Sequence, residues 1–157
     1  MNNEISQLLE KYISAYPKIK DIADKLTEEE INFIPSSNKW SIRQILHHLC
    51  DTEMMLTTRV FRILTEDNPP LQAYDQNKWA VELGYDKLDP QVAILTFGLL
   101  RQRMYQLYMT LPDSAWQRKG IHSERGEITL FDMLKTYANH GESHLEQINK
   151  NLTAYKS

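Results

Sequence analysis

Histidines are the residues of this sequence whose spacing could support chemistry. His140 and His144 are four residues apart, so on a helix they lie on one face and can point at one metal ion. Both fall on the apolar side of the predicted helix, flanking the line of Met133 and Tyr137. Gly141 lies between them and would let a neighbouring helix approach closely. The spacing predicts half of a metal site, and a hydrogen-bonded pair in a metal-free core stays open as the alternative.

A histidine on an earlier helix would complete this site. His47 and His48 are adjacent, so their side chains point about 100° apart and only one is expected to face the core. The apolar stripe of this helix is centred on Ile45, Leu49 and Leu56. His48 lies at the edge of the stripe, and His47 lies nearly opposite it. We therefore expect His48 to be a metal ligand and His47 to face solvent.

Two acidic residues close to His48 are candidates for supporting roles. Asp51 lies one turn from His48 and could orient its ring by accepting a hydrogen bond. Glu53 falls inside the apolar stripe, where a carboxylate is unfavourable unless it is paired or bonded to a metal-linked group. Glu53 is therefore a candidate catalytic residue, with an interhelical ion pair as an equal alternative.

The ligand types predict what kind of centre this would be. Three neutral imidazoles would leave a coordination position open to water or substrate, as in catalytic rather than structural sites. A metal ion there would lower the pKa of a bound water or thiol and make a nucleophile available near neutral pH. A fourth protein ligand, such as Glu53 or His122, would instead favour a non-catalytic binding module.

Four amphipathic segments would position these histidines. Helical spacing of apolar residues predicts helices over residues 3–26, 42–66, 89–111 and 130–154. Pro17 should kink the first helix or split it in two. The stripe of the third helix runs through Val92, Leu95, Leu99, Leu100, Met104, Leu107 and Leu111. An all-α four-helix bundle is the economical fold.

Local signals mark where three of these helices begin. Ser41 and Gln44 have the spacing of a capping box, and Thr129 and Asp132 resemble a second one. Asp89-Pro90 is a favourable pair for the N-cap and the first helical position. These signals place the starts of the second, third and fourth helices.

The connections carry further candidates. Residues 27–38 are predicted to be a polar connection. Residues 67–88 are predicted to form a long loop between helices 2 and 3, and such loops are usually functional or disordered. Aromatic residues argue against disorder in that loop. The 116–128 segment precedes the last helix, and a short hairpin can form over residues 118–129. The two segments would roof the metal site, with Tyr74 and Trp79 as candidate substrate contacts and His122 as a candidate catalytic residue. The alternatives are that the aromatic residues pin the loop to the bundle and that His122 is a polar loop residue.

Composition and charge exclude several classes of function. The chain has 157 residues, which are expected to form a single domain over 1–157. Its net charge is −3 and its basic residues form no stripe, which argues against nucleic-acid binding. It has no apolar run long enough for a membrane span and no signal-peptide pattern. Its one cysteine, Cys50, fits a reducing compartment, so we expect a cytoplasmic protein.

Two motifs and the residues between them resemble the DinB/YfiT-like family of four-helix-bundle proteins. The resemblance covers about residues 35 to 150. It rests on Trp40-Ser41-Ile42-Arg43-Gln44-Ile45-Leu46-His47-His48-Leu49-Cys50-Asp51, Asn68-Pro69-Pro70, Tyr74, Lys78-Trp79-Ala80, His122, Gly126, Thr129-Leu130 and Tyr137-Ala138-Asn139-His140-Gly141-Glu142-Ser143-His144. Ser143 and Gln147 stand where some YfiT-like relatives carry further histidines.

The resemblance implies a metal centre and a class of reaction. The family's metal-binding histidines match His48, His140 and His144, the set that the helix faces also select. The resemblance implies a divalent ion, zinc or nickel, and an activity of either a hydrolase or a low-molecular-weight-thiol S-transferase, as described for some bacillithiol-using members. It also implies a small-molecule substrate and a homodimer. The alternative function is a non-catalytic metal- or ligand-binding bundle that acts as a sensor or interaction module.

Overall fold

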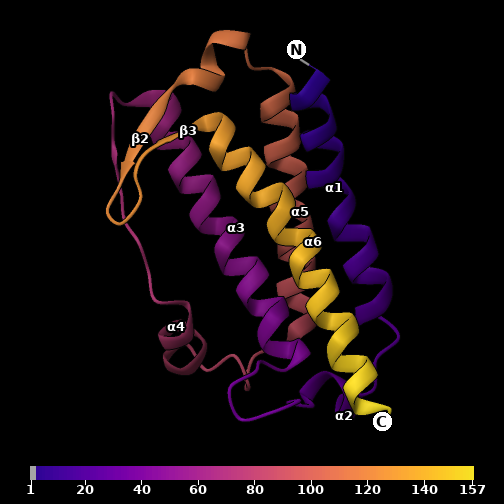
Figure 1. Ribbon diagram of the computed structural model, residues 1–157. Helices are drawn as coiled ribbons and strands as arrows, with labels where there is room; N and C mark the ends of the chain where they lie inside the picture. Colours follow the sequence, from indigo (N-terminus) through magenta and orange to yellow (C-terminus); the bar gives the residue numbers. More distant parts are fainter. Residues whose placement is uncertain (1–2) are drawn as a thin grey trace.

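Four long helices form the body of the protein, shown as a computed structural model in Figure 1. The structure describes residues 3–157, so residues 1 and 2 of the expected single domain lie outside the described part. The bundle consists of α1 (Asn3–Ala23), α3 (Ile42–Thr65), α5 (Pro90–Met109) and α6 (Leu130–Tyr155). The predicted four-helix bundle is confirmed. None of the described helices has the length and apolarity needed to cross a membrane.

The predicted helix starts are all present. The side chains of Ser41 and Gln44 each accept a hydrogen bond from the other's backbone N–H, as do those of Thr129 and Asp132. Asp89 caps α5, with Pro90 in its first turn. These caps satisfy backbone N–H groups that have no partner within the helix. The starts of α3, α5 and α6 are therefore determined by local sequence.

The first helix and the connection after it differ from the prediction in detail. Pro17 lies inside α1, which continues through it as one helix and is not split. The connection expected over residues 27–38 contains a short helix, α2 (Glu28–Asn32), which begins with a capping box formed by Thr27 and Glu30. Capping and three acidic residues in the first turn stabilise this short helix although most of its side chains are exposed.

The buried face of α5 is not the one that its apolar stripe predicts. Val92 and Leu99 are 62% and 68% exposed, so this part of the expected stripe faces outward. The face toward the bundle carries Ala93, Ile94, Phe97, Gly98, Arg101, Met104 and Tyr108. Two contacts explain this rotation. The ring of Tyr16 lies where a side chain at Gly98 would project, and the guanidinium of Arg101 reaches into the core.

The long connection between α3 and α5 contains its own structure. It includes the short strand β1 (Pro70–Leu71) and the helix α4 (Gln76–Glu82), which Asp75 caps. A 3₁₀ helix, η1 (Asp113–Gln117), follows α5 and precedes the hairpin. In Figure 1 the connection runs along α3 on the side away from α1. This segment and the hairpin lie on the same side of the bundle.

The predicted hairpin is present and joins the long connection in a small sheet. Its strands are β2 (Lys119–His122) and β3 (Gly126–Thr129), paired antiparallel. β1 pairs with β2 in parallel, which places Leu71 beside His122. The strand order is therefore β1-β2-β3. This pairing brings residues from the two connections to one place on the bundle.

Candidate metal centre

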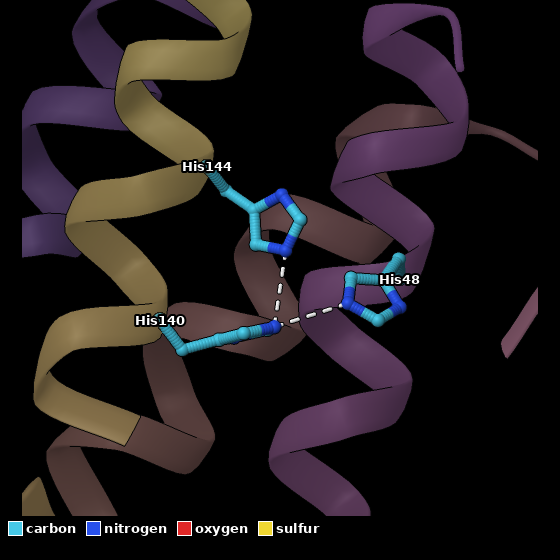
Figure 2. Close-up of side chains that lie close together, drawn as sticks. All are labelled: His48, His140 and His144. Atoms are coloured by element: carbon cyan, nitrogen blue, oxygen red, sulfur yellow. Dashed lines mark hydrogen bonds between the residues drawn. The ribbon is translucent and has the colours of Figure 1, made fainter. Parts of the chain in front are cut away.

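Three histidines converge between α3 and α6. His48 projects from α3 toward His140 and His144, which project from consecutive turns of α6 (Figure 2). The Nε2 atom of His140 lies 3.1 Å from Nε2 of His48 and 3.0 Å from Nε2 of His144. One ligand nitrogen from each of the three rings lies within 4.8 Å of the other two. Within residues 3–157, no other histidine, cysteine or carboxylate joins this group.

The two separations through His140 fit ligands of one ion. Metal–nitrogen bonds of about 2.0–2.1 Å place neighbouring ligand nitrogens about 2.8–3.4 Å apart in octahedral or tetrahedral coordination. The observed contacts through His140 lie within that range. The three imidazoles therefore have the chemistry of ligands for a divalent cation, and the two separations through His140 match the spacing of such ligands.

A hydrogen bond sets the tautomer of His144. Its Nδ1 atom lies 2.9 Å from Oε1 of Gln147, one turn further along α6. A carbonyl oxygen can only accept, so Nδ1 of His144 carries the proton and Nε2 presents its lone pair to the cluster. Partners of this kind fix the orientation and basicity of metal-binding histidines. Gln147 thus prepares His144 to act as a ligand.

Burial keeps all three imidazoles neutral. Desolvation, with a smaller effect from His144, lowers the pKa of His48 to about 3. Desolvation also lowers the pKa of His140, with contributions from the neighbouring histidines and Arg101, and it lowers the pKa of His144. Neutral imidazole is the form that binds metal ions. The site is therefore ready to bind a cation without first losing protons near neutral pH.

The close packing of α6 against α1 depends on Gly141, as its position between the two histidines suggested. A Cβ atom at Gly141 would lie 2.7 Å from Cβ of Ala15 and 2.9 Å from Nη1 of Arg101. Gly141 therefore allows α6 to pack closely against α1. His140 and His144, on either side of it in the sequence, project from α6 toward α3.

The prediction that His47 faces solvent is wrong. His47 is only 7% exposed, because the connection after α4 covers this face of α3. Its ring stacks on Tyr85 with centroids 5.4 Å apart, and its Nε2 lies 3.3 Å from the backbone oxygen of Leu88. His47 therefore packs α3 against this connection, on a different face from the three clustered histidines.

Asp51 does not contact His48, which corrects the role expected for it. Its carboxylate accepts a hydrogen bond from the hydroxyl of Tyr85. The side chain beside the His48 ring is Thr52, whose Oγ1 lies 3.4 Å from both ring nitrogens and donates to the backbone oxygen of His48. Both residues lie within about one turn of His48, but the Asp51 side chain is turned toward Tyr85 and the Thr52 side chain toward the His48 ring.

Glu53 forms the interhelical ion pair that the sequence left open as an alternative. It is 1% exposed and lies 3.1 Å from Nε of Arg101, which is fully buried on α5. Tyr12 donates a second hydrogen bond to the same carboxylate. These contacts place Glu53 in the bundle core and not among the residues that line the cavity described below.

A cavity of about 390 Å³ opens beside the histidines. Its wall includes His48 and His140 from the cluster, Tyr74 from the long connection and His122 from the hairpin. Trp79 is not part of the wall but stacks on Tyr74, with ring centroids 4.3 Å apart. The two connections thus cover the site as expected, with Tyr74 facing the cavity and Trp79 supporting it.

Sequence reasoning missed several residues of this site. The cavity wall also contains Arg59, Arg125 and Tyr137, and Gln147 supports the cluster from outside. Arg59 had a detectable signal, because it lies at helical spacing from two apolar residues of α3, three residues after Leu56 and four before Ile63. A cation at such a position is unusual unless it has a partner or a function.

Comparison with known proteins identifies the family. The sequence pattern described as the DinB superfamily matches residues 14–148. The chain belongs to the DinB superfamily. The match includes all three clustered histidines.

Named relatives carry a functional description. A protein of Oceanobacillus iheyensis named "Putative metal-dependent hydrolase" is 30% identical over 130 residues, 83% of this chain and 75% of its own length. YfiT of Bacillus subtilis, with the same description, is 29% identical over 132 residues, 83% of this chain and 74% of its own length.

A solved structure shows the same fold. The structure titled "YfiT from Bacillus subtilis is a probable metal-dependent hydrolase with an unusual four-helix bundle topology" superposes with a TM-score of 0.90 at 25% identity. It covers 96% of this chain and 87% of that one. The two chains therefore share the same fold.

Proposed function

We propose that this protein is a metal-dependent enzyme that uses a divalent ion bound by His48, His140 and His144. The observation that carries the proposal is the convergence of three neutral imidazoles beside a cavity. Within the described residues no fourth protein ligand joins the three histidines, which favours a catalytic over a structural metal site. The names of the relatives support hydrolysis as the first candidate reaction.

The cavity next to the histidines would hold a small-molecule substrate. The ion, zinc or nickel, would supply an acidified water or thiol as nucleophile. Tyr74 and Trp79 would provide an aromatic wall, and His122 could hold or transfer a proton at the edge of the cavity. Transfer of a low-molecular-weight thiol, assembly as a homodimer and a cytoplasmic location are further parts of this proposal that come from the resemblance and the composition.

Metal content and activity test the proposal. The His140→Ala variant should lose its bound ion by elemental analysis, because the central nitrogen of the cluster is removed. The matched control is His122→Ala, which lies on the same cavity outside the cluster and should keep the ion. Zinc- and nickel-loaded protein should then hydrolyse members of an ester and amide panel or conjugate a small thiol.

Two results would contradict the proposal in different ways. Unchanged metal content in His140→Ala would remove the metal site itself. Bound metal without either activity would instead favour the alternative of a non-catalytic sensor or interaction module.

A further inference from the structure

The wall of the cavity carries a buried positive charge without a negative partner. Arg59 is 8% exposed, and no carboxylate of residues 3–157 forms an ion pair with it. Other arginines are paired, for example Arg101 with Glu53 and Arg43 with Glu28. A buried charge is unfavourable unless something compensates for it, so Arg59 needs an explanation.

The contacts of Arg59 hold it in place without neutralising it. One terminal nitrogen donates to the backbone oxygen of Gln72, and the other lies 3.4 Å from the hydroxyl of Tyr137. The guanidinium lies 5.6 Å from the ring centroid of Tyr74. Its Nε has no hydrogen-bond partner among the described residues. Arg59 is thus positioned by neutral groups and keeps its full charge at the cavity wall.

Two neighbouring side chains offer further protons to the cavity. The Tyr137 hydroxyl accepts from Arg59, and within the described residues no acceptor for its own proton is found. His122 is 7% exposed, and its Nδ1 accepts the backbone N–H of Glu124, so the neutral ring carries its proton on Nε2. Burial, with help from Arg59 and Arg125, lowers the pKa of His122 and keeps this ring neutral.

The acidic residues of the cavity do not compensate for Arg59. Asp75 accepts the backbone N–H groups of Asn77 and Lys78, so its carboxylate serves as the cap of α4. Glu124 is exposed at the hairpin turn, next to Arg125, which is also exposed. The buried part of the wall is therefore rich in hydrogen-bond donors and positive in charge.

We propose that Arg59, Tyr137 and His122 form a subsite for an oxyanion, a carboxylate or phosphate group of the substrate. This inference rests on the proposed function, because the same wall contains His48 and His140. A substrate held by its anionic group at Arg59 would lie with its remaining part next to the three histidines. Arginine suits this role because it keeps its charge and presents several donors to a planar or tetrahedral oxyanion.

Binding of simple anions tests the subsite without an assay of activity. Inorganic phosphate and acetate are titrated by calorimetry into zinc-loaded and metal-free full-length protein, with chloride as the reference anion. The Arg59→Gln variant should bind the preferred anion about tenfold more weakly or worse, a loss of about 1.4 kcal/mol or more. The matched control is Arg103→Gln, an exposed arginine of α5, which should bind as the unaltered protein does.

The outcomes of these titrations distinguish the anionic group, the subsite and the metal site. A preference for phosphate or for acetate identifies the anionic group. Equal affinity of unaltered and Arg59→Gln protein would show that the anion binds elsewhere, for instance on the ion, and would overturn the subsite. Absence of phosphate and acetate binding at millimolar concentrations would overturn it as well. If the unaltered protein does not bind zinc or nickel, the proposed function is contradicted. The subsite is tested separately, because anion binding is also measured with the metal-free protein.

Milder variants keep the test decisive if Arg59→Gln does not fold. Tyr137→Phe and His122→Gln each remove one proposed donor while retaining most of the side-chain shape. Each should weaken the preferred anion severalfold with an unchanged metal content. Anion affinities equal to that of the unaltered protein in both variants would contradict the subsite.

Discussion

At the residue scale, the candidate centre is built from three imidazoles whose protonation is set by their surroundings. Desolvation keeps them neutral, and the contact between His144 and Gln147 selects the tautomer that exposes Nε2. From the sequence, Gln147 was only a position where some YfiT-like relatives carry a histidine. In this chain the amide has a specific role, which is to accept the Nδ1 proton of His144.

Replacement of Gln147 tests that role. Gln147→Leu removes the acceptor, so the ring of His144 is freer to rotate or change tautomer, and zinc affinity should fall about 10- to 100-fold. Competition with a chromophoric chelator measures this affinity. Gln147→Glu supplies another acceptor and should restore most of it. Gln102→Leu, at an exposed position of α5, is the control and should leave the affinity unchanged. Equal affinities in all variants would contradict the role assigned to Gln147.

At the scale of elements, Arg101 connects the four helices at the level of the cluster. From α5 it donates to Glu53 of α3, to the backbone oxygen of Tyr12 on α1 and to that of Tyr137 on α6. Its guanidinium also lies 4.3 Å from the ring centroid of Tyr12. Arg101 is fully buried, so these bonds are shielded from water. They hold α3 and α6 at the spacing that brings the histidines together.

Removal of Arg101 should therefore destabilise the bundle strongly. Arg101→Met leaves Glu53 buried without its cation, and we expect a loss of about 3–5 kcal/mol in the free energy of unfolding, measured with urea. Lys18→Met is the control, because it breaks an exposed pair between α1 and α6 and should change this free energy by less than about 1 kcal/mol. Similar losses in both variants would show that the Arg101 network is not a principal contact of the core.

At the scale of the whole molecule, burial of three neutral histidines links stability to pH. The pKa of His48 is about 3 in the folded chain, below the ordinary value of 6.5, so the unfolded chain takes up the proton first. This contribution to stability is fully present above pH 6.5 and decreases as the pH falls toward 3. The lowered pKa values of His140 and His144 act in the same direction.

Urea unfolding of the metal-free protein at pH 6 and pH 5 measures this linkage. We expect the free energy of unfolding to decrease by about 1 kcal/mol over this unit from His48 alone, approaching the limit of 1.4 kcal/mol for one proton. The His48→Gln variant lacks this group and should show a smaller decrease. An equal pH dependence in the two proteins would mean that His48 titrates normally in the folded state.

The sequence by itself determined the features that depend on local spacing. The caps at Ser41, Asp89 and Thr129, the helix periods and the face shared by His140 and His144 are each defined within a few residues. The choice of His48 over His47 also follows from one helix, since the side chains of adjacent residues diverge by about 100°. The hairpin could be predicted from its turn residues.

Only the tertiary structure decided which side chains meet across the bundle. The rotation of α5, with Val92 and Leu99 outward, depends on Tyr16 and Arg101 and not on its own apolar stripe. The burial of His47 depends on the path of the connection that covers it. The gathering of donors around the cavity requires the small sheet that brings His122 to the side of α3. Contacts between distant segments depend on how the helices rotate and where the connections run, and local spacing determines neither.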